Sequence, residues 1–231
     1  MDLLVEGIRQ AVALLLAGDG EVWTVLWLSL AVSGSATLVS LAVGIPVGTA
    51  LALARFPGRG LVVSAVNSGM GLPPVVVGLF VTIALWRSGP LGGLEILYTP
   101  AAIIVAQAVI AAPIVTGITL AAVQNVPREF RLQLLALGAS RAQMLWVVLR
   151  EARLPMLAAV MAGFGGVISE IGASMMVGGN IKGQTRTLTT ATVLETSKGN
   201  FDVAIALSLL LLALVFLVNW ALTAIQQRRA G

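Results

Sequence analysis

The sequence predicts an all-α integral membrane protein with five transmembrane helices and a short amphipathic helix at the N-terminus. Of the 231 residues, 58% are hydrophobic and only 10% are charged, whereas a soluble domain needs about 25% charged residues to cover its surface. Several apolar runs reach the roughly 20 residues with which a helix crosses a bilayer core of about 30 Å. The basic residues gather between alternate runs, which is typical of membrane proteins of fixed orientation.

Five apolar runs are long enough to span a bilayer: Val22–Leu53, Leu61–Trp86, Thr99–Val123, Leu154–Gly178 and Val203–Ile225. An earlier run, Leu3–Ala17, is too short and contains Glu6, Arg9 and Gln10. Its residues Leu4, Ile8, Val12 and Leu15 share one helical face. We therefore expect residues 1–21 to hold an interfacial helix, with a sixth span at this point as the less favoured alternative. Residues 22–225 then form the membrane domain and 226–231 a short tail.

The distribution of charge predicts the orientation. Basic residues dominate the loop at 55–59, the segment 127–153 and the C-terminus, while the loops on the other side are mainly acidic. Under the positive-inside rule the C-terminus is cytoplasmic and the N-terminus lies outside. An odd number of spans agrees with this placement. We expect a multi-pass protein of the cell membrane.

Composition excludes several classes of function. The chain contains neither cysteine nor histidine. This removes disulfides, thiol nucleophiles, the usual zinc ligand sets and a Ser-His-Asp triad. The pI near 10.7 comes without a basic patch interleaved with aromatic residues, so it does not indicate nucleic-acid binding. We expect no catalytic residue, no metal and no cofactor.

The segment Pro127–Pro155 is polar, lies between two apolar runs and contains five arginines. Apolar residues recur at helical spacing on both sides of Gly138. Glycine adopts positive φ without steric cost, so Gly138 is expected either to make a sharp turn between two helices or to end one helix as an ordinary C-cap. A helix–Gly–helix element on the basic side offers a docking surface to a soluble partner, which favours a driven transporter over a channel.

The same segment resembles the cytoplasmic loop of type I ABC importer permeases. Leu137–Arg141 matches the core of that loop, and Leu154–Pro155 falls where such permeases resume their membrane helix. The E-A-A positions of the family loop read Leu132–Leu134 here, which is a departure. Leu72–Gly78 resembles the L-P-P-x-V-x-G of molybdate, tungstate and sulfate permeases. The run from Ser169 to Leu188 is similar to a block of the same branch, most of all to that of tungstate permeases.

This resemblance implies a type I ABC permease fold over 22–225, serving an importer of a tetrahedral oxyanion, tungstate first and molybdate next. It implies that separate cytoplasmic ATPase subunits hydrolyse ATP and that an extracytoplasmic solute-binding protein delivers the anion. The coupling loop 127–153 would dock the ATPase through Leu137, Gly138, Ala139, Ser140 and Arg141. Small residues in the spans, such as Gly44–Gly48, Ala159–Gly163 and Gly165–Gly166, suit close helix contact. Each motif alone is explained by packing inside one subunit, but together with the small bundle they favour a homodimer.

Several residues are candidates for the translocation pathway or its gate. Pro73 and Pro74 interrupt a span, and irregular backbone at membrane depth is tolerated where it lines a cavity. Glu170 is the only acid in a predicted span, so it makes a structural hydrogen bond to a helix end or an arginine, or it acts as a gate. The full set is Pro73, Pro74, Glu170, Ser174, Asn180, Lys182, Thr185, Arg186 and Thr187.

The stretch Gly178–Thr185 is close to a phosphate-binding P-loop, but Gln184 stands where the loop needs lysine and no strand precedes it. Its amides, Lys182 and Arg186 could instead face a passing anion. Equally, the loop could cap a helix over Leu188–Ser197. The rival function, a self-sufficient secondary transporter or channel, would need charged relays or an inverted repeat within the spans.

Overall fold

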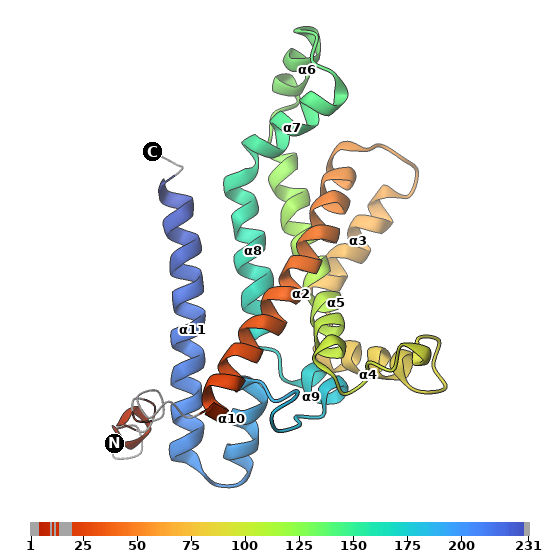
Figure 1. The fold of residues 1–231 in the computed structure, drawn as a ribbon. Coiled ribbons are helices and arrows are strands. Elements are labelled where there is room, and N and C mark those ends of the chain that lie inside the picture. Colours follow the sequence, from red (N-terminus) through yellow and green to blue (C-terminus); the bar gives the residue numbers. More distant parts are fainter. Residues whose placement is uncertain (1–4, 10, 12, 14–19, 229–231) are drawn as a thin grey trace.

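The computed structural model describes residues 5–9, 11, 13 and 20–228. None of the described residues forms a β-strand. The helices are α2 (Gly20–Leu53), α3 (Arg59–Met70), α4 (Pro74–Leu85), the 3₁₀ turn η1 (Gly92–Leu94), α5 (Pro100–Gln124), α6 (Arg128–Ala136), α7 (Arg141–Glu151), α8 (Arg153–Ile168), α9 (Gly172–Gly178), α10 (Leu188–Ser197) and α11 (Phe201–Arg228). The long helices run side by side, with α6 and α7 projecting from one end and α4, α9 and α10 at the other (Figure 1).

Three helices are long and apolar enough to cross a membrane by themselves: α2, α5 and α11. The other two predicted spans are broken. The pair α3 and α4 is bent by 102°, and the pair α8 and α9 by 60°. The break in Leu61–Trp86 falls at Pro73 and Pro74, where the sequence predicts an interruption, whereas the break in Leu154–Gly178 was not predicted. The total of five spans holds when each bent pair counts as one.

The first break follows from two adjacent prolines. Pro73 is the extended N-cap of α4, and Pro74 is its first residue. Proline lacks a backbone N–H and disfavours helical φ/ψ in the residue before it, so α3 ends at Met70 and a new helix starts in another direction. The second break falls at Ser169–Ile171, between α8 and α9, and contains Glu170.

Glycines bring α2 against α5 within the subunit. A Cβ on Gly44 would lie 2.6 Å from Val115 Cγ1, and one on Gly48 would lie 2.5 Å from the Thr116 carbonyl oxygen. Only glycine allows this approach. A Cβ on Gly163 of α8 would likewise lie 3.2 Å from Val115 Cγ2. Gly44, Gly48 and Gly163 thus pack inside one subunit, which is one of the two roles that the sequence allowed for these motifs.

Only part of the predicted N-terminal helix falls within the described residues. Residues 5–9, 11 and 13 are helical, and Gly7 packs against Ile205 of α11. Ile8, the one described member of the predicted apolar face, is 53% exposed. The remaining residues of that face, Leu4, Val12 and Leu15, lie outside the described residues.

Candidate functional site

The turn between α6 and α7 is built by Gly138. Its φ is +87°, in the left-handed region that glycine occupies without steric cost. The Gly138 amide donates to the Leu135 carbonyl and the Ala139 amide to the Leu134 carbonyl, both at 3.0 Å. This pair of bonds is the Schellman motif that ends a helix. Gly138 therefore makes the sharp turn and also ends α6 as a helix C-cap, so both expectations describe the same conformation.

The next helix begins two residues later with its own cap. Ser140 accepts a hydrogen bond from the Gln143 amide at 3.3 Å, and the Gln143 side chain accepts from the Ser140 amide at 2.8 Å. This reciprocal capping box fixes the start of α7. The chain direction through Ala139 is therefore set from both sides, and the turn has a defined shape.

The turn is held away from the bundle by a small core. Val148 and Ala152 pack with Val123, at the end of α5, and with Val126, which follows that helix. The residues beyond this core are exposed: Leu137 at 85%, Trp146 at 60% and Leu132 at 52%. A Cβ on Gly138 would meet no atom within 4 Å. An apolar, projecting and locally rigid surface is suited to packing against another protein.

At the other end of the bundle, Glu170 occupies the break between α8 and α9. Glu170 is 9% exposed, and its Oε1 atom accepts a hydrogen bond at 2.9 Å from the backbone amide of Ala173, in the first turn of α9. The hydroxyl of Thr189 donates to its carbonyl at 3.3 Å. Glu170 thus makes the bond to a helix end that the sequence offered as one alternative, and no arginine pairs with it among the described residues.

Ser174 lies one turn further along α9 and is 1% exposed. Its hydroxyl oxygen accepts a hydrogen bond from the side-chain nitrogen Nε2 of Gln107, in α5, at 3.2 Å. Near this point α4 packs closely on α9, because a Cβ on Gly78 would lie 2.7 Å from Ala173 Cα. Pro73 and Pro74 lie at the start of α4, so the two broken spans meet at this junction.

The loop between α9 and α10 is held largely by its own hydroxyls and by the helix it caps. The Thr185 hydroxyl accepts from the Ile181 amide at 2.9 Å and donates to the Gly178 carbonyl at 2.6 Å. Thr187 caps α10 in a capping box with Thr190. Asn180 has φ +51° and donates to the Thr190 carbonyl at 3.3 Å. Thr187 thus caps the helix over Leu188–Ser197, as one of the two alternatives expected.

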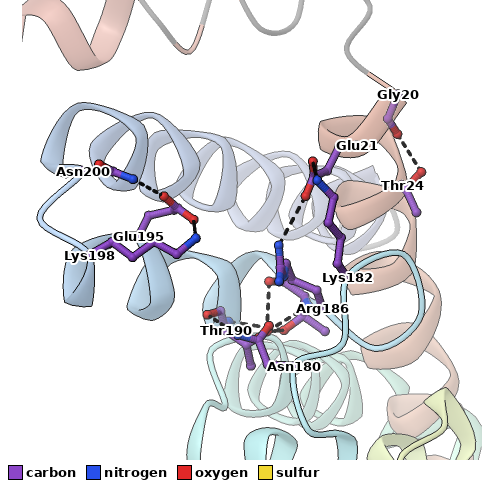
Figure 2. Close-up of polar contacts among 11 residues, drawn as sticks. Gly20, Glu21, Thr24, Asn180, Lys182, Arg186, Thr190, Glu195, Lys198 and Asn200 are labelled. Carbon is purple, nitrogen blue, oxygen red and sulfur yellow. Dashed lines mark hydrogen bonds and ion pairs between the residues drawn. The ribbon is translucent and has the colours of Figure 1, made fainter.

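The two cations of this loop are paired with an acid that sequence reasoning missed. Glu21, in the first turn of α2, accepts from Lys182 Nζ at 2.6 Å and from Arg186 Nη1 at 3.3 Å. Figure 2 shows both side chains reaching toward Glu21. The Arg186 side chain is 17% exposed and that of Lys182 is 68% exposed. No short-range sequence signal reveals this pairing, because Glu21 and Arg186 are 165 positions apart.

The structure thus divides the predicted residues between two ends. The five coupling residues form one continuous turn beyond α5 and α8, while the gate and pathway residues gather around α4, α9 and the start of α10 (Figure 1). Within the part of the chain that the structure describes, no three acidic side chains come together as a metal site would require.

Comparison with known proteins decides the family. Residues 44–231 match the family described as the binding-protein-dependent transport system inner membrane component. The chain belongs to this family. The permease is 39% identical over 227 residues to the tungstate uptake system permease protein TupB of Peptoclostridium acidaminophilum, covering 98% of this chain and all of that protein. It is 44% identical over 196 residues to a probable anion ABC transporter permease protein of Haloferax volcanii, covering 83% of this chain and 84% of that one.

Solved structures agree on the fold. The inward-facing MetNI methionine ABC transporter contains a chain that superposes with a TM-score of 0.74 at 22% identity, over 91% of this permease and 98% of that chain. The expected type I ABC permease fold is therefore confirmed. The rival assignment, a self-sufficient secondary transporter or channel, finds no support in the family or in the fold.

Proposed function

We propose that this permease carries tungstate across the cell membrane, with molybdate as the second candidate. The observation that carries the proposal is the 39% identity to a tungstate uptake permease along the whole of both chains. The similarity to a probable anion permease agrees with an anionic substrate. The Leu72–Gly78 and Ser169–Leu188 segments, which resemble those of oxyanion permeases, form the α4–α9 junction and the loop that follows it.

The energy comes from separate ATPase subunits on the cytoplasmic side, which dock on Leu137, Gly138, Ala139, Ser140 and Arg141. The permease itself hydrolyses nothing. The Schellman turn and the Ser140 cap give this segment a fixed shape, and a rigid projection transmits a displacement better than a flexible loop does. The exposed Leu137 side chain supplies apolar area for the contact.

The translocation pathway runs beside the α4–α9 junction, between two copies of the permease. Helices interrupted at Pro73–Pro74 and at Glu170 place irregular backbone within the membrane, where it is tolerated next to a cavity or within protein. A solute-binding protein docks at the end that carries α10, and the N-terminus lies on that outer side. Glu170, Thr185 and Thr187 act there by shaping the backbone, since their polar atoms are engaged in local hydrogen bonds.

The decisive experiment is uptake by proteoliposomes that contain the permease with its ATPase and binding protein. Tungstate, molybdate and sulfate should be offered separately, with ATP or a non-hydrolysable analogue inside. ATP-dependent accumulation of tungstate in preference to molybdate is expected. Accumulation driven by an ion gradient without ATP would contradict the ABC mechanism, and a preference for sulfate would contradict the substrate.

A further inference from the structure

Four arginines from three separate elements line one cleft at the end of the bundle that carries α6 and α7. Arg55 follows α2, Arg59 is the first residue of α3, and Arg128 and Arg131 lie on α6. The cleft has a volume of about 480 Å³. We call it the arginine cleft. Its other walls are Ala52, Leu53, Ala54, Leu132 and Met144.

The positive charge of the arginine cleft is not neutralised within the part of the chain that the structure describes. No acidic residue lines the cleft, and none of the ion pairs among the described residues involves these four arginines. Arg59 Nε donates to the Leu51 carbonyl at 2.7 Å, which holds that side chain in place. Arg131 Nε is buried without a hydrogen-bond partner. A buried donor is stabilised when it gains an acceptor, so Arg131 Nε is available to a bound anion.

The N-terminus of α6 adds to the same field. Arg128, which lines the cleft, is the first residue of this helix, and the N-cap residue Pro127 provides no side-chain hydrogen bond to the first amides. At the start of α3, by contrast, the amides of Arg59 and Leu61 already donate to the Phe56 and Gly58 carbonyls at 3.3 and 3.0 Å. Free amides and the helix dipole favour an anion at the start of α6. The guanidinium groups offer the paired donors that fit a tetrahedral anion.

Apolar surface adjoins this charge. Leu53, Leu132 and Met144 form part of the walls. Close by in the chain, Phe56 is 42% exposed and Leu61 is 79% exposed, next to Arg55 and Arg59. The cleft lies where the long apolar helix α2 ends. The end of a membrane-spanning helix is expected near the lipid headgroups. A free inorganic anion would pair with the arginines but would leave the apolar surface beside them exposed.

We propose that the arginine cleft binds the phosphate group of an anionic phospholipid, with the acyl chains lying along the exposed apolar residues beside it. The positive-inside rule accounts for basic residues at this end, but it does not require them to converge on one cleft. The bound lipid bridges α6 to the ends of α2 and α3, and so steadies the base of the coupling turn. On the orientation proposed above, the site faces the inner leaflet.

The test uses the purified full-length permease in a zwitterionic detergent at constant ionic strength. Phosphatidylglycerol and phosphatidylcholine with identical acyl chains are titrated, and bound lipid is counted by native mass spectrometry. We expect phosphatidylglycerol to bind more tightly than phosphatidylcholine. The double variant Arg55→Gln with Arg128→Gln should lower the affinity for phosphatidylglycerol by about fivefold for each arginine removed. Both side chains are exposed, so the fold should persist.

The matched control is Arg150→Gln, at the same end but stacked on Trp146 outside the cleft, which should leave lipid binding unchanged. Inorganic phosphate and tungstate, each added alone, distinguish the sources of the anion. Displacement of the lipid by millimolar phosphate, or protection against unfolding by phosphate without lipid, would overturn the lipid assignment. Equal binding of both lipids, or an equal loss in Arg150→Gln, would overturn the site.

Discussion

Glu21 and Arg186 form an ion pair at 3.3 Å between the first turn of α2 and the residue that precedes the N-cap of α10. Lys182 joins the same carboxylate at 2.6 Å. The pairing ties the loop between α9 and α10 to the first long helix. It also means that the two cations, which the sequence offered to a passing anion, already have a partner of opposite charge.

We predict that Arg186→Glu lowers the unfolding temperature of the permease while uptake per folded molecule stays close to that of the wild type. The change removes one contact and places two carboxylates together. Because Glu21 is 40% exposed, the lost attraction is screened and amounts to about 1 kcal/mol. Uptake and thermal stability should be measured on one preparation.

Lys182→Glu is the matched control for this prediction, because the Lys182 side chain is 68% exposed and should matter less for stability. A large fall in uptake with an unchanged unfolding temperature in Arg186→Glu would instead assign Arg186 to the anion pathway.

Substitutions at Gly138 should separate turn conformation from docking. Gly138→Val places a β-branched residue at φ +87°, which costs at least about 1–2 kcal/mol locally, and should abolish substrate-stimulated ATPase activity in the assembled transporter. Gly138→Asn should retain most of that activity, since asparagine tolerates the left-handed region. The space around Gly138 is open, so neither change clashes within the permease.

The membrane bundle of both Gly138 variants should unfold at the wild-type temperature, because the turn projects beyond it. If Gly138→Asn also uncouples the ATPase, bulk at this position rather than backbone conformation governs docking. Normal stimulated activity in Gly138→Val would remove the turn from the coupling contact altogether.

Orientation can be checked with single cysteines, since the chain has none of its own. Ser88 and Ala142 are both exposed. Ser88 follows α4 and Ala142 lies in α7, and these two helices lie toward opposite ends of the molecule (Figure 1). We expect Ser88→Cys to react with a membrane-impermeant maleimide in intact cells and Ala142→Cys to react only after the membrane is opened. Labelling of Ala142→Cys in intact cells would reverse the orientation and move the coupling turn outside.

Two glycines of α2 should respond to alanine in opposite ways. In Gly48→Ala the new methyl group would lie 2.5 Å from a backbone oxygen of α5, so the helices must separate, at a cost of about 1–3 kcal/mol. Gly34→Ala meets nothing within 4 Å, and alanine favours the helix by about 0.5–1 kcal/mol. Thermal unfolding of both variants in the same detergent measures the difference, and an unchanged midpoint for Gly48→Ala would contradict the close α2–α5 contact.

Glu195 should make stability depend on pH at the α10 end. Hydrogen bonds from Asn200 and Lys198, aided by the charges of Lys198 and Arg186, lower the pKa of Glu195 below its usual 4.5. A lowered pKa in the folded state adds stability above the usual value, and that contribution is lost as the pH falls through the lowered one. Glu195→Gln should therefore unfold at a lower temperature than the wild type near neutral pH and at the same temperature in strong acid. A difference that persisted unchanged in acid would show that the carboxylate charge is not its cause.

The sequence by itself determined the class of protein, five spans when each bent pair counts as one, and the position of the turn at Gly138. These depend on local properties. Apolar length sets which segments enter the bilayer, and the need for positive φ sets Gly138 at the turn. The start of α10 was also foreseen as one of two alternatives, because Thr187 caps it through residues only three positions away.

Only the tertiary structure decided which contacts the predicted site residues make. Glu170 was visible as the one acid in a span, but its bond to the start of α9 depends on the 60° bend between α8 and α9. Glu21 became the partner of Lys182 and Arg186 only when α2 and the distant loop came together. The four arginines of the cleft likewise come from three elements. Which charged side chains pair depends on their distance in the folded protein. The spacing of residues along one segment does not reveal that distance.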